Sequence, residues 1–297
     1  MRRCPRVHRH FHRLKVRSSW RRLALHSWGS PADPSIYALL DIDVTQALSW
    51  IAAAREASGT HVTVTHLVGV AAARALRERP DVNAFVRRGR GLWRRDTVDV
   101  FFMVARDGGE DLLGAKVEHA DAKDPVAVAR ELERHVRVVR VVRAHRAGAL
   151  DRTNALLERL PGLLVGPAMK VTEALLYDLG LDLRRFGLPF DPFGSVMVTN
   201  VGMFGLPVAL APLVPFARTP VMITVGEIGD TPVAVEGRAV VRPVMTLGVT
   251  LDHRVLDGAQ GGQLARAFRA VLEDPWGSLG APVGDPSARG PSAPAQA

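Results

Sequence analysis

VMTLGVTLDHRVLDG, residues 244–258, is the stretch around which the rest of the chain is arranged. Its first half is apolar and rich in β-branched residues, which predicts a buried strand. It ends in a compact polar cluster with one imidazole, His253, and two carboxylates, Asp252 and Asp257. A helical pattern follows, and its apolar face holds Leu264, Ala267, Phe268, Val271 and Leu272. A strand therefore delivers His253 to a turn that a helix fixes in place, an arrangement that can hold a side chain for chemistry.

The composition predicts a globular protein with a substantial core. Apolar residues make up 47% of the 297 residues, which is far from the composition of a disordered chain. The sequence has no apolar run of about 18 residues and no apolar signal-peptide core, so we expect neither a transmembrane helix nor a secretory signal. The single cysteine, Cys4, cannot form an internal disulfide or a cysteine-based metal site. A cytoplasmic location fits this cysteine usage best.

The net charge of +9 comes from the N-terminus. Residues 1–22 contain nine Lys and Arg and no acidic residue, which leaves 30 basic and 30 acidic residues in the rest of the chain. Such a tail can bind nucleic acid, an anionic membrane or an acidic partner. This one lacks the aromatic interleaving and helical periodicity of binding segments. We therefore favour an unstructured extension and predict neither nucleic acid nor membrane as a partner.

Strand and helix patterns interleave without regular βαβ alternation, which predicts an α/β protein with a mixed or largely antiparallel sheet covered by helices. Strands are expected at 36–44, 98–105, 112–117, 194–200, 221–228, 231–235 and from 240, with a hairpin around 88–91. Helices are expected at 19–28, 45–59, 61–79, 124–146, 151–160, 167–179 and 258–273. Linker-like composition occurs only at the ends. We expect one domain over 19–279, between a disordered basic tail at 1–18 and a disordered Gly/Pro/Ala/Ser tail at 280–297.

Several common catalytic motifs are absent from the sequence. It has no P-loop, no glycine-rich dinucleotide fingerprint, no Gly-x-Ser-x-Gly elbow and no His-Glu-x-x-His. His8, His10 and His12 lie close together but lack acidic or cysteine partners, so we expect no metal site. His253 can act as a general base, since imidazole titrates near neutral pH. On spacing alone, a hydrogen-bonded core histidine in a turn is the more common explanation of this motif.

Two segments resemble a known family. Asp252-His253-Arg254-Val255-Leu256-Asp257-Gly258 is similar to the Asp-His-Arg-x-x-Asp-Gly signature of the 2-oxo acid dehydrogenase acyltransferases, also called dihydrolipoamide acyltransferases. Val198-Thr199-Asn200-Val201-Gly202-Met203-Phe204-Gly205 resembles their Ile-Ser-Asn-Leu-Gly-Met-Phe-Gly segment. Shorter similarities at 80–84, 120–123 and 221–247 follow in the same order, and the resemblance covers roughly 17–276. It implies a two-layer fold like that of chloramphenicol acetyltransferase, assembled as a trimer with active sites between subunits.

The resemblance also implies roles for individual residues. His253 would be the general base that deprotonates the thiol of CoA or dihydrolipoamide. Thr199 occupies the place of the family's oxyanion-stabilising serine and keeps its hydroxyl. Asp257 would be structural and pair with Arg21 or Arg22. Asn200 and Asn83 are candidates for contacts with substrate, and Lys123 is a candidate for contact with the phosphates of CoA. We expect the apolar, Pro-rich run 206–220 to contribute to a subunit interface.

The sequence departs from the family pattern in two places. The recognisable part starts within about 20 residues of Met1, so we expect a lipoyl group to be supplied by another chain. Extra helical sequence lies between about Asp151 and Pro192. The resulting hypothesis is a CoA-dependent acyltransferase with a thiol acceptor, working with lipoyl-domain proteins or 2-oxo acid dehydrogenase components and needing no metal. Two alternatives stay open: a non-catalytic trimeric scaffold or regulatory paralogue, and an acyltransferase with a non-lipoyl acceptor.

Overall fold

The computed structural model describes residues 11–15, 34–106, 111–145, 162–186 and 188–282. The predicted helices at 19–28 and 151–160, the turn at 107–109 and most of both tails lie outside these ranges. The strands are β1 (Phe11–Arg13), β2 (Ser35–Asp43), β3 (Ala84–Arg87), β4 (Gly91–Arg95), β5 (Val100–Arg106), β6 (Asp111–Val117), β7 (Val196–Asn200), β8 (Val221–Val235) and β9 (Arg238–Asp252). The α-helices are α2 (Thr45–Ser58), α3 (Val64–Glu78), α4 (Pro125–His145), α6 (Gly162–Glu173), α7 (Gly258–Glu273) and α8 (Pro275–Leu279).

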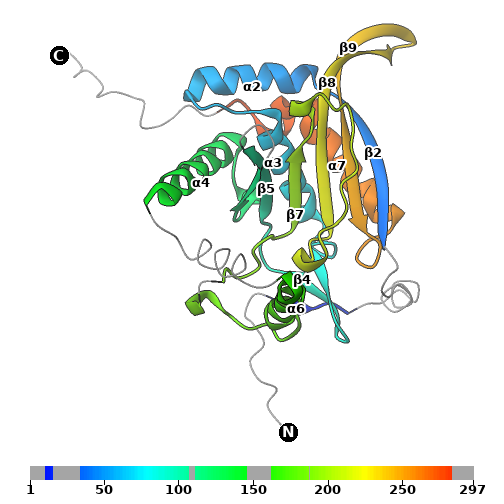
Figure 1. The fold of residues 1–297 in the computed structure, drawn as a ribbon. Helices are drawn as coiled ribbons and strands as arrows, with labels where there is room; N and C mark the ends of the chain where they lie inside the picture. Colours follow the sequence, from blue (N-terminus) through cyan, green and yellow to red (C-terminus); the bar gives the residue numbers. More distant parts are fainter. Residues whose placement is uncertain (1–10, 16–33, 107–110, 146–161, 187, 283–297) are drawn as a thin grey trace, which may run out of the picture.

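A six-stranded mixed sheet forms the centre of the molecule, in the order β2-β9-β8-β7-β5-β6 (Figure 1). β7 is parallel to both β5 and β8, and the other pairs are antiparallel. This confirms the predicted α/β class with a mixed sheet. The sequence suggested separate strands at 221–228 and 231–235, but β8 is one long strand that passes through an irregularity between Val225 and Ile228.

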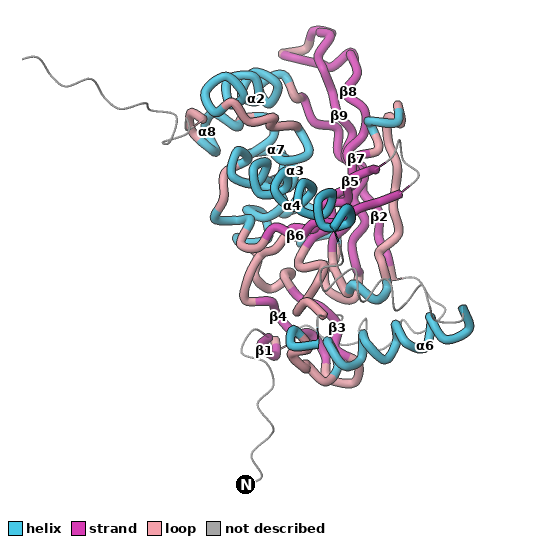
Figure 2. The backbone as a smooth tube through the Cα atoms, turned by 60° about the vertical axis from the view of Figure 1, so that its left-hand side comes forward, coloured by secondary structure: helices cyan, strands magenta, loops and turns pink. Residues whose placement is uncertain are grey.

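Helices cover one face of this sheet (Figure 2). α3 packs on β5 and β7, α7 packs on β2 and on α3, and α4 packs on β6. The predicted periodicity holds: Leu264, Phe268, Val271 and Leu272 of α7 are all buried in the core. Burial of these apolar faces supplies most of the favourable free energy of folding.

The opposite face of the sheet is partly covered by the irregular segment 206–214. The hydroxyl groups of Thr224 and Thr250 donate to carbonyls of this segment, and the Glu227 N–H donates to the Leu206 carbonyl at 2.9 Å. Position 248 of β9, which this segment crosses, needs a glycine, because a Cβ there would collide with the Ala209 carbonyl oxygen. The segment's other side stays open, with Leu206, Val208 and Leu210 exposed.

A second sheet has three strands, in the order β1-β4-β3, and lies below the six-stranded sheet in the view of Figure 2. The predicted hairpin around 88–91 is confirmed as the β3–β4 turn. The prediction of a structureless tail over 1–18 is wrong at Phe11–Arg13, because these residues add a strand to the edge of β4. Backbone pairing at an open strand edge needs no apolar side-chain pattern, so it cannot be predicted from such a pattern.

The described C-terminal part of the insertion is helical. α6 continues into a π-helical turn, η3 (Ala174–Asp178), and a 3-10 turn, η4 (Arg184–Phe186). The sequence predicted that this helix starts at Pro167, but it starts at Gly162 and Pro167 lies inside it. Pro167 is the sixth residue of α6, beyond the first turn, so its missing N–H removes one i→i−4 hydrogen bond from the helix. Within the described ranges, no helix combines the length and apolarity needed to cross a bilayer.

Candidate functional site

His253 directly follows the last residue of β9, and its backbone is tied to two neighbouring segments. The His253 N–H donates to the Pro34 carbonyl at 2.8 Å, and the preceding Asp252 N–H donates to the Pro220 carbonyl at 2.9 Å. The imidazole Nδ1 lies 3.0 Å from the Leu256 carbonyl oxygen. A carbonyl only accepts, so this contact places the proton on Nδ1 and the ring's lone pair on Nε2. A neutral imidazole in this tautomer is suited to accept a proton at Nε2.

Asp257 caps the helix that follows His253. Its carboxylate accepts from the N–H groups of Ala259 at 3.0 Å and Gln260 at 3.3 Å, and the Gln260 side chain accepts from the Asp257 N–H at 2.8 Å. This reciprocal capping box satisfies backbone donors that the first turn of α7 would otherwise leave unpaired. Asp257 therefore shapes the turn that presents His253. Arg21 and Arg22, its predicted partners, lie outside the described residues.

Thr199 lies near the end of β7, between Met103 of β5 and Thr224 of β8. Strand side chains alternate, so Thr199 shares with Met197 the face that points away from the helices. The next residue, Asn200, donates from Nδ2 to Thr65 Oγ1 at 2.8 Å and accepts from the Met203 N–H at 3.1 Å. The amide of Asn200 thus ties β7 to α3 and to the following turn, and a substrate contact by Asn200 stays a prediction. Asn200 thereby fixes the backbone that carries Thr199.

One chain does not bring Thr199 and His253 together. Thr199 is level with Thr224 on β8, and Thr224 is level with Gly248 on β9, five residues before His253. At about 3.3 Å per residue and about 4.8 Å per strand spacing, the two residues are roughly 19 Å apart. Thr199 lies partway along the sheet, whereas His253 lies just beyond the end of β9. A site that uses both side chains has to take them from two different chains.

The sequence of this chain matches the model of the 2-oxoacid dehydrogenases acyltransferase catalytic domain over residues 25–153 and 193–279. The chain belongs to this acyltransferase family. The unmatched residues between these two ranges coincide with the extra sequence predicted between about Asp151 and Pro192, so the insertion is confirmed.

Individual relatives agree with the family assignment. The chain is 31% identical over 130 residues to the acetyltransferase component of the pyruvate dehydrogenase complex of Rhizobium meliloti, covering 40% of this chain and 29% of that protein. It is 26% identical over 223 residues to the acetyltransferase component of the acetoin cleaving system of Bacillus subtilis, covering 75% of this chain and 44% of that protein. The chain thus spans less than half the length of these relatives.

The fold is that of solved members of the family. A dihydrolipoamide acetyltransferase of Azotobacter vinelandii superposes with a TM-score of 0.57 at 20% identity, covering 83% of this chain and 84% of that chain. A truncated catalytic core of the 2-oxoacid dehydrogenase complex from Thermoplasma acidophilum gives a TM-score of 0.53 at 18% identity, covering 89% and 99% of the two chains. At these identities the likeness establishes the architecture alone.

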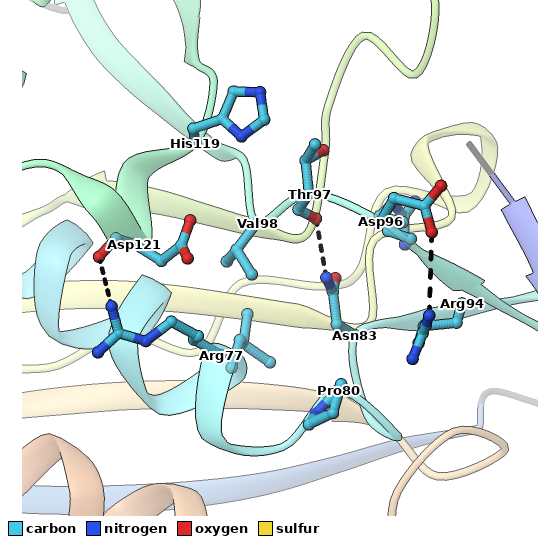
Figure 3. A pocket seen from close by; sticks show the side chains of 11 residues that line it. Arg77, Pro80, Asn83, Arg94, Asp96, Thr97, Val98, His119 and Asp121 are labelled. Carbon is cyan, nitrogen blue, oxygen red and sulfur yellow. Dashed lines mark hydrogen bonds and ion pairs between the residues drawn. The ribbon is translucent and has the colours of Figure 1, made fainter. Parts of the chain in front are cut away.

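Asn83 and Lys123, the other predicted substrate contacts, have structural partners. Asn83 is only 2% exposed and its Nδ2 donates to the Thr97 carbonyl at 2.8 Å. It lines a polar cavity of about 240 Å³ together with Arg77, Asp96, His119 and Asp121 (Figure 3). Lys123 pairs with Glu131 at 2.6 Å and donates to the Glu118 carbonyl at 2.7 Å. Both bonds hold the ammonium group of Lys123 beside α4, and a contact with CoA phosphates stays a prediction.

No metal centre is visible in the described part of the chain, where no group of three or more His, Cys, Asp or Glu side chains converges. Of the three histidines near the N-terminus, His8 and His10 lie outside the described residues. His12 lies on β1 and contacts Asp96, the residue after β4, at 2.9 Å, so the contact links β1 to the end of β4.

Sequence reasoning missed a buried ionic cluster beside the insertion. Arg95 pairs with Asp191 at 2.6 Å, and the Tyr177 hydroxyl donates to the same carboxylate at 2.8 Å. Burial alone would raise the pKa of Asp191, but the charge of Arg95 and these hydrogen bonds lower it. Arg218 forms a second centre and binds Glu173 at 2.8 Å and Asp178 at 2.6 Å. The one available signal was the isolation of Arg218 within the apolar run 206–220.

Sequence reasoning also missed His66, in the first turn of α3. Its Nδ1 accepts from the Thr63 N–H at 3.0 Å and so caps the helix. Burial, reinforced by the nearby charges of His61 and Arg55, lowers the pKa of His66 to about 4. His66 is therefore neutral at physiological pH and has a structural function.

Proposed function

We propose that this protein is an acyltransferase that moves an acyl group between CoA and a thiol acceptor of the dihydrolipoamide type, with His253 as the general base. The observation that carries the proposal is the bond from His253 Nδ1 to the Leu256 carbonyl at 3.0 Å. This bond fixes the tautomer in which Nε2 accepts a proton, on a turn held by β9 and by the cap of α7. CoA and the lipoyl thiol are the two substrates of this reaction.

The reaction begins with proton transfer to His253 and ends with return of that proton. His253 Nε2 takes the proton from the attacking thiol, and the thiolate sulfur bonds to the thioester carbonyl carbon. The carbonyl oxygen of the tetrahedral intermediate becomes negative, and the Thr199 hydroxyl donates a hydrogen bond to it. Collapse of the intermediate breaks the original carbon–sulfur bond. The departing thiolate then regains the proton from His253, which returns the base to its neutral state.

The sheet geometry favours a trimer with its sites between protomers. Thr199 and His253 lie roughly 19 Å apart in one chain by strand spacing. We propose that Thr199 of one protomer faces His253 of the next. The face that carries Thr199 also presents an apolar surface suited to subunit contact, formed by the exposed side chains of Tyr37, Leu39, Leu206, Val208 and Leu210. A closed ring of three would use this surface and give three equivalent sites.

Acyl exchange between acetyl-CoA and dihydrolipoamide tests the proposal. We expect His253→Ala to lower the rate by about two to four orders of magnitude, since general-base catalysis contributes that much. Thr199→Ala should lower it by about two orders of magnitude, whereas Thr199→Ser should retain most of the rate. His135→Ala serves as the matched control, because this exposed histidine lies on α4. Wild-type activity in His253→Ala would remove His253 from the mechanism.

A second candidate function is transfer to an acceptor other than a lipoyl thiol. The insertion between the two matched ranges favours it, because sequence outside the family model can reshape the acceptor side of the site. Profiling alcohols, amines and thiols with acetyl-CoA separates the two candidates. Calorimetry with CoA addresses the scaffold alternative, since a scaffold that only assembles would form trimers without binding CoA. The predicted cytoplasmic location stays a prediction.

A further inference from the structure

The polar cavity of about 240 Å³ that contains Asn83 lies where the small sheet joins the main body of the chain (Figure 3). Its walls come from the C-terminal end of α3, from β4 and the residues that connect β4 to β5, and from the 3-10 turn η2 (Ala120–Ala122) with the residue before it. A single water needs about 10–15 Å³ of such volume. The cavity therefore has room for a small organic molecule.

Two buried side chains in the wall each keep one polar atom without a hydrogen-bond partner in the described chain. Asn83 is 2% exposed and Arg95 is 3% exposed, and the two atoms are Asn83 Oδ1 and Arg95 Nη1. The other polar atoms of both side chains are engaged. Asn83 Nδ2 donates to the Thr97 carbonyl at 2.8 Å, and Arg95 donates to Asp191 from Nε at 2.6 Å and from Nη2 at 3.3 Å. Buried polar groups are normally satisfied, so these two atoms are the natural contacts for a ligand.

The two atoms belong to side chains on one face of the small sheet. Asn83 lies opposite Arg95, because Ala84 pairs with Arg94 and the Arg95 N–H donates to the Asn83 carbonyl at 2.8 Å. Directly opposite residues of an antiparallel pair project from the same face, with their Cβ atoms about 4.5–5.5 Å apart. One small molecule can therefore meet both atoms. It has to accept a hydrogen bond from Arg95 and donate one to Asn83.

One cation and one anion of the cavity wall form no ion pair with another described residue. Arg77 is exposed, and its Nη1 donates to the backbone carbonyl of Asp121 at 3.1 Å, which leaves the Asp121 carboxylate free. Figure 3 shows these two side chains together on one side of Asn83. The other charges of the wall have partners: Arg95 has its buried carboxylate, and Arg94 and Asp96 lie 4.0 Å apart. The groups that remain are thus one of each sign.

A zwitterion is complementary to this set of groups. Its carboxylate accepts from arginine N–H groups, and its ammonium group donates to amide and carboxylate oxygens. A simple anion would leave the Asn83 oxygen and the Asp121 carboxylate unmatched, and a simple cation would leave the arginine donors unmatched. Leu76, Pro80 and Val98 complete the wall with apolar surface, which suits a short aliphatic side chain.

We propose that this cavity binds a free α-amino acid with a short aliphatic side chain. The carboxylate of the amino acid accepts from Arg95 Nη1 and is attracted by Arg77. Its ammonium group donates to Asn83 Oδ1 and is attracted by Asp121. Neither Thr199 nor any residue of the turn that carries His253 lines the cavity, so the inference stands without the proposed function.

Calorimetry with three probes tests the charge requirement. L-Valine carries both charges, isovalerate has the same branched chain with the carboxylate alone, and isobutylamine has it with the ammonium group alone. We expect L-valine to bind at one site per chain and to raise the Tm, because a ligand of the folded state stabilises it. Isovalerate and isobutylamine should each bind at least about tenfold more weakly, since each leaves polar groups of the cavity unmatched.

Two variants of the full-length chain test the position of the site. Asn83→Leu removes the buried acceptor and Arg77→Ala removes the exposed cation, and each should weaken L-valine binding about tenfold. Arg77→Ala changes a surface position and keeps the test decisive if Asn83→Leu fails to fold by circular dichroism. Arg266→Ala removes an exposed arginine of α7 that does not line the cavity, so this matched control should bind like wild type.

Three results would overturn the proposal. Absence of L-valine binding at millimolar concentrations would leave water as the occupant of the cavity. Equal affinity for L-valine and isovalerate would make it a simple anion site. Wild-type affinity for L-valine in Arg77→Ala and in folded Asn83→Leu would place the amino acid elsewhere on the protein.

Discussion

Thr199 and His253 of one chain lie two strands apart and five residues out of register in the same sheet. Side chains so placed cannot act on one reaction within a single chain, because the carbonyl oxygen must lie within about 3 Å of the Thr199 hydroxyl and the attacking thiol within about 3 Å of the His253 imidazole. If both take part in acyl transfer, each site contains residues from two protomers. This relationship makes the assembly itself a testable part of the mechanism.

Mixed trimers test whether the site is shared. His253→Ala and Thr199→Ala protomers should each be nearly inactive alone, and co-expression should restore activity. In a ring of three, every mixed trimer contains one site with an intact His253 and an intact Thr199. Random equal mixing therefore predicts about one quarter of the wild-type rate. Acyl-exchange rates of the purified mixture measure this.

The control for mixed trimers is a mixture of two protomer types that both carry His253→Ala, distinguished only by their affinity tags. It should stay inactive. If the mixture of different variants also stays inactive while light scattering shows mixed trimers, the two residues do not share a site.

The cap of α7 by Asp257 predicts a graded effect on stability. Asp257→Ala removes an acceptor for two backbone N–H groups and should lower the free energy of unfolding by about 1 kcal/mol. Asp257→Asn keeps a capping oxygen and should lower the free energy of unfolding by only a few tenths of a kcal/mol. Urea unfolding followed by circular dichroism measures both. Equal losses for the two variants would show that the charge of Asp257, and not its capping bond, stabilises the turn.

Much of this architecture could be predicted from the sequence. The apolar run before His253 and the periodicity after Gly258 correctly predicted β9 and α7, because both elements are held mainly by burial of their own side chains. Gly59 correctly marked the end of α2, since it adopts a left-handed φ of +64°. The family resemblance implied a structural function for Asp257, and its carboxylate caps α7.

Contacts between distant segments could not be predicted in this way. Thr199 is some 50 positions before His253 in the sequence, and only the strand register reveals that the two lie two strands and five residues apart. Arg95 and Arg218 meet the insertion through pairings that leave no local pattern. The family resemblance suggests Asn200 and Lys123 as substrate contacts, and their hydrogen bonds to neighbouring segments leave no signal in the sequence.

The pair of Arg95 and Asp191 predicts a large effect of a single substitution. Arg95→Met leaves the buried Asp191 carboxylate without its cation, which should lower the free energy of unfolding by about 3–5 kcal/mol at neutral pH. The adjacent Arg94→Met, at a partly exposed position, is the matched control and should cost less than about 1 kcal/mol.

The same pair also predicts the direction of a pH effect. The pKa of Asp191 is lowered in the folded state, so the ion pair stabilises the fold above the ordinary carboxyl pKa of about 4. That stability is lost as the pH falls through the lower native pKa. The difference between wild type and Arg95→Met should therefore narrow in acid. A constant difference across pH would show that packing of the Arg95 side chain, and not its charge, is what the variant removes.

His66 predicts a separate and milder pH dependence. Its pKa is about 4 in the folded protein against an ordinary value of 6.5, so the unfolded chain binds more protons between these values. Stability from neutral His66 is complete above about pH 6.5 and is lost as the pH falls toward 4. At about 1.4 kcal/mol per tenfold change in proton affinity, the full loss is about 3 kcal/mol.

His66→Gln keeps a capping acceptor without titrating, so its stability should be less sensitive to pH over this window. The exposed His135→Gln is the control and should behave like wild type. Urea unfolding at pH 7, 5.5 and 4.5 gives the slopes, and parallel slopes for wild type and His66→Gln would mean that His66 is not held neutral by the fold.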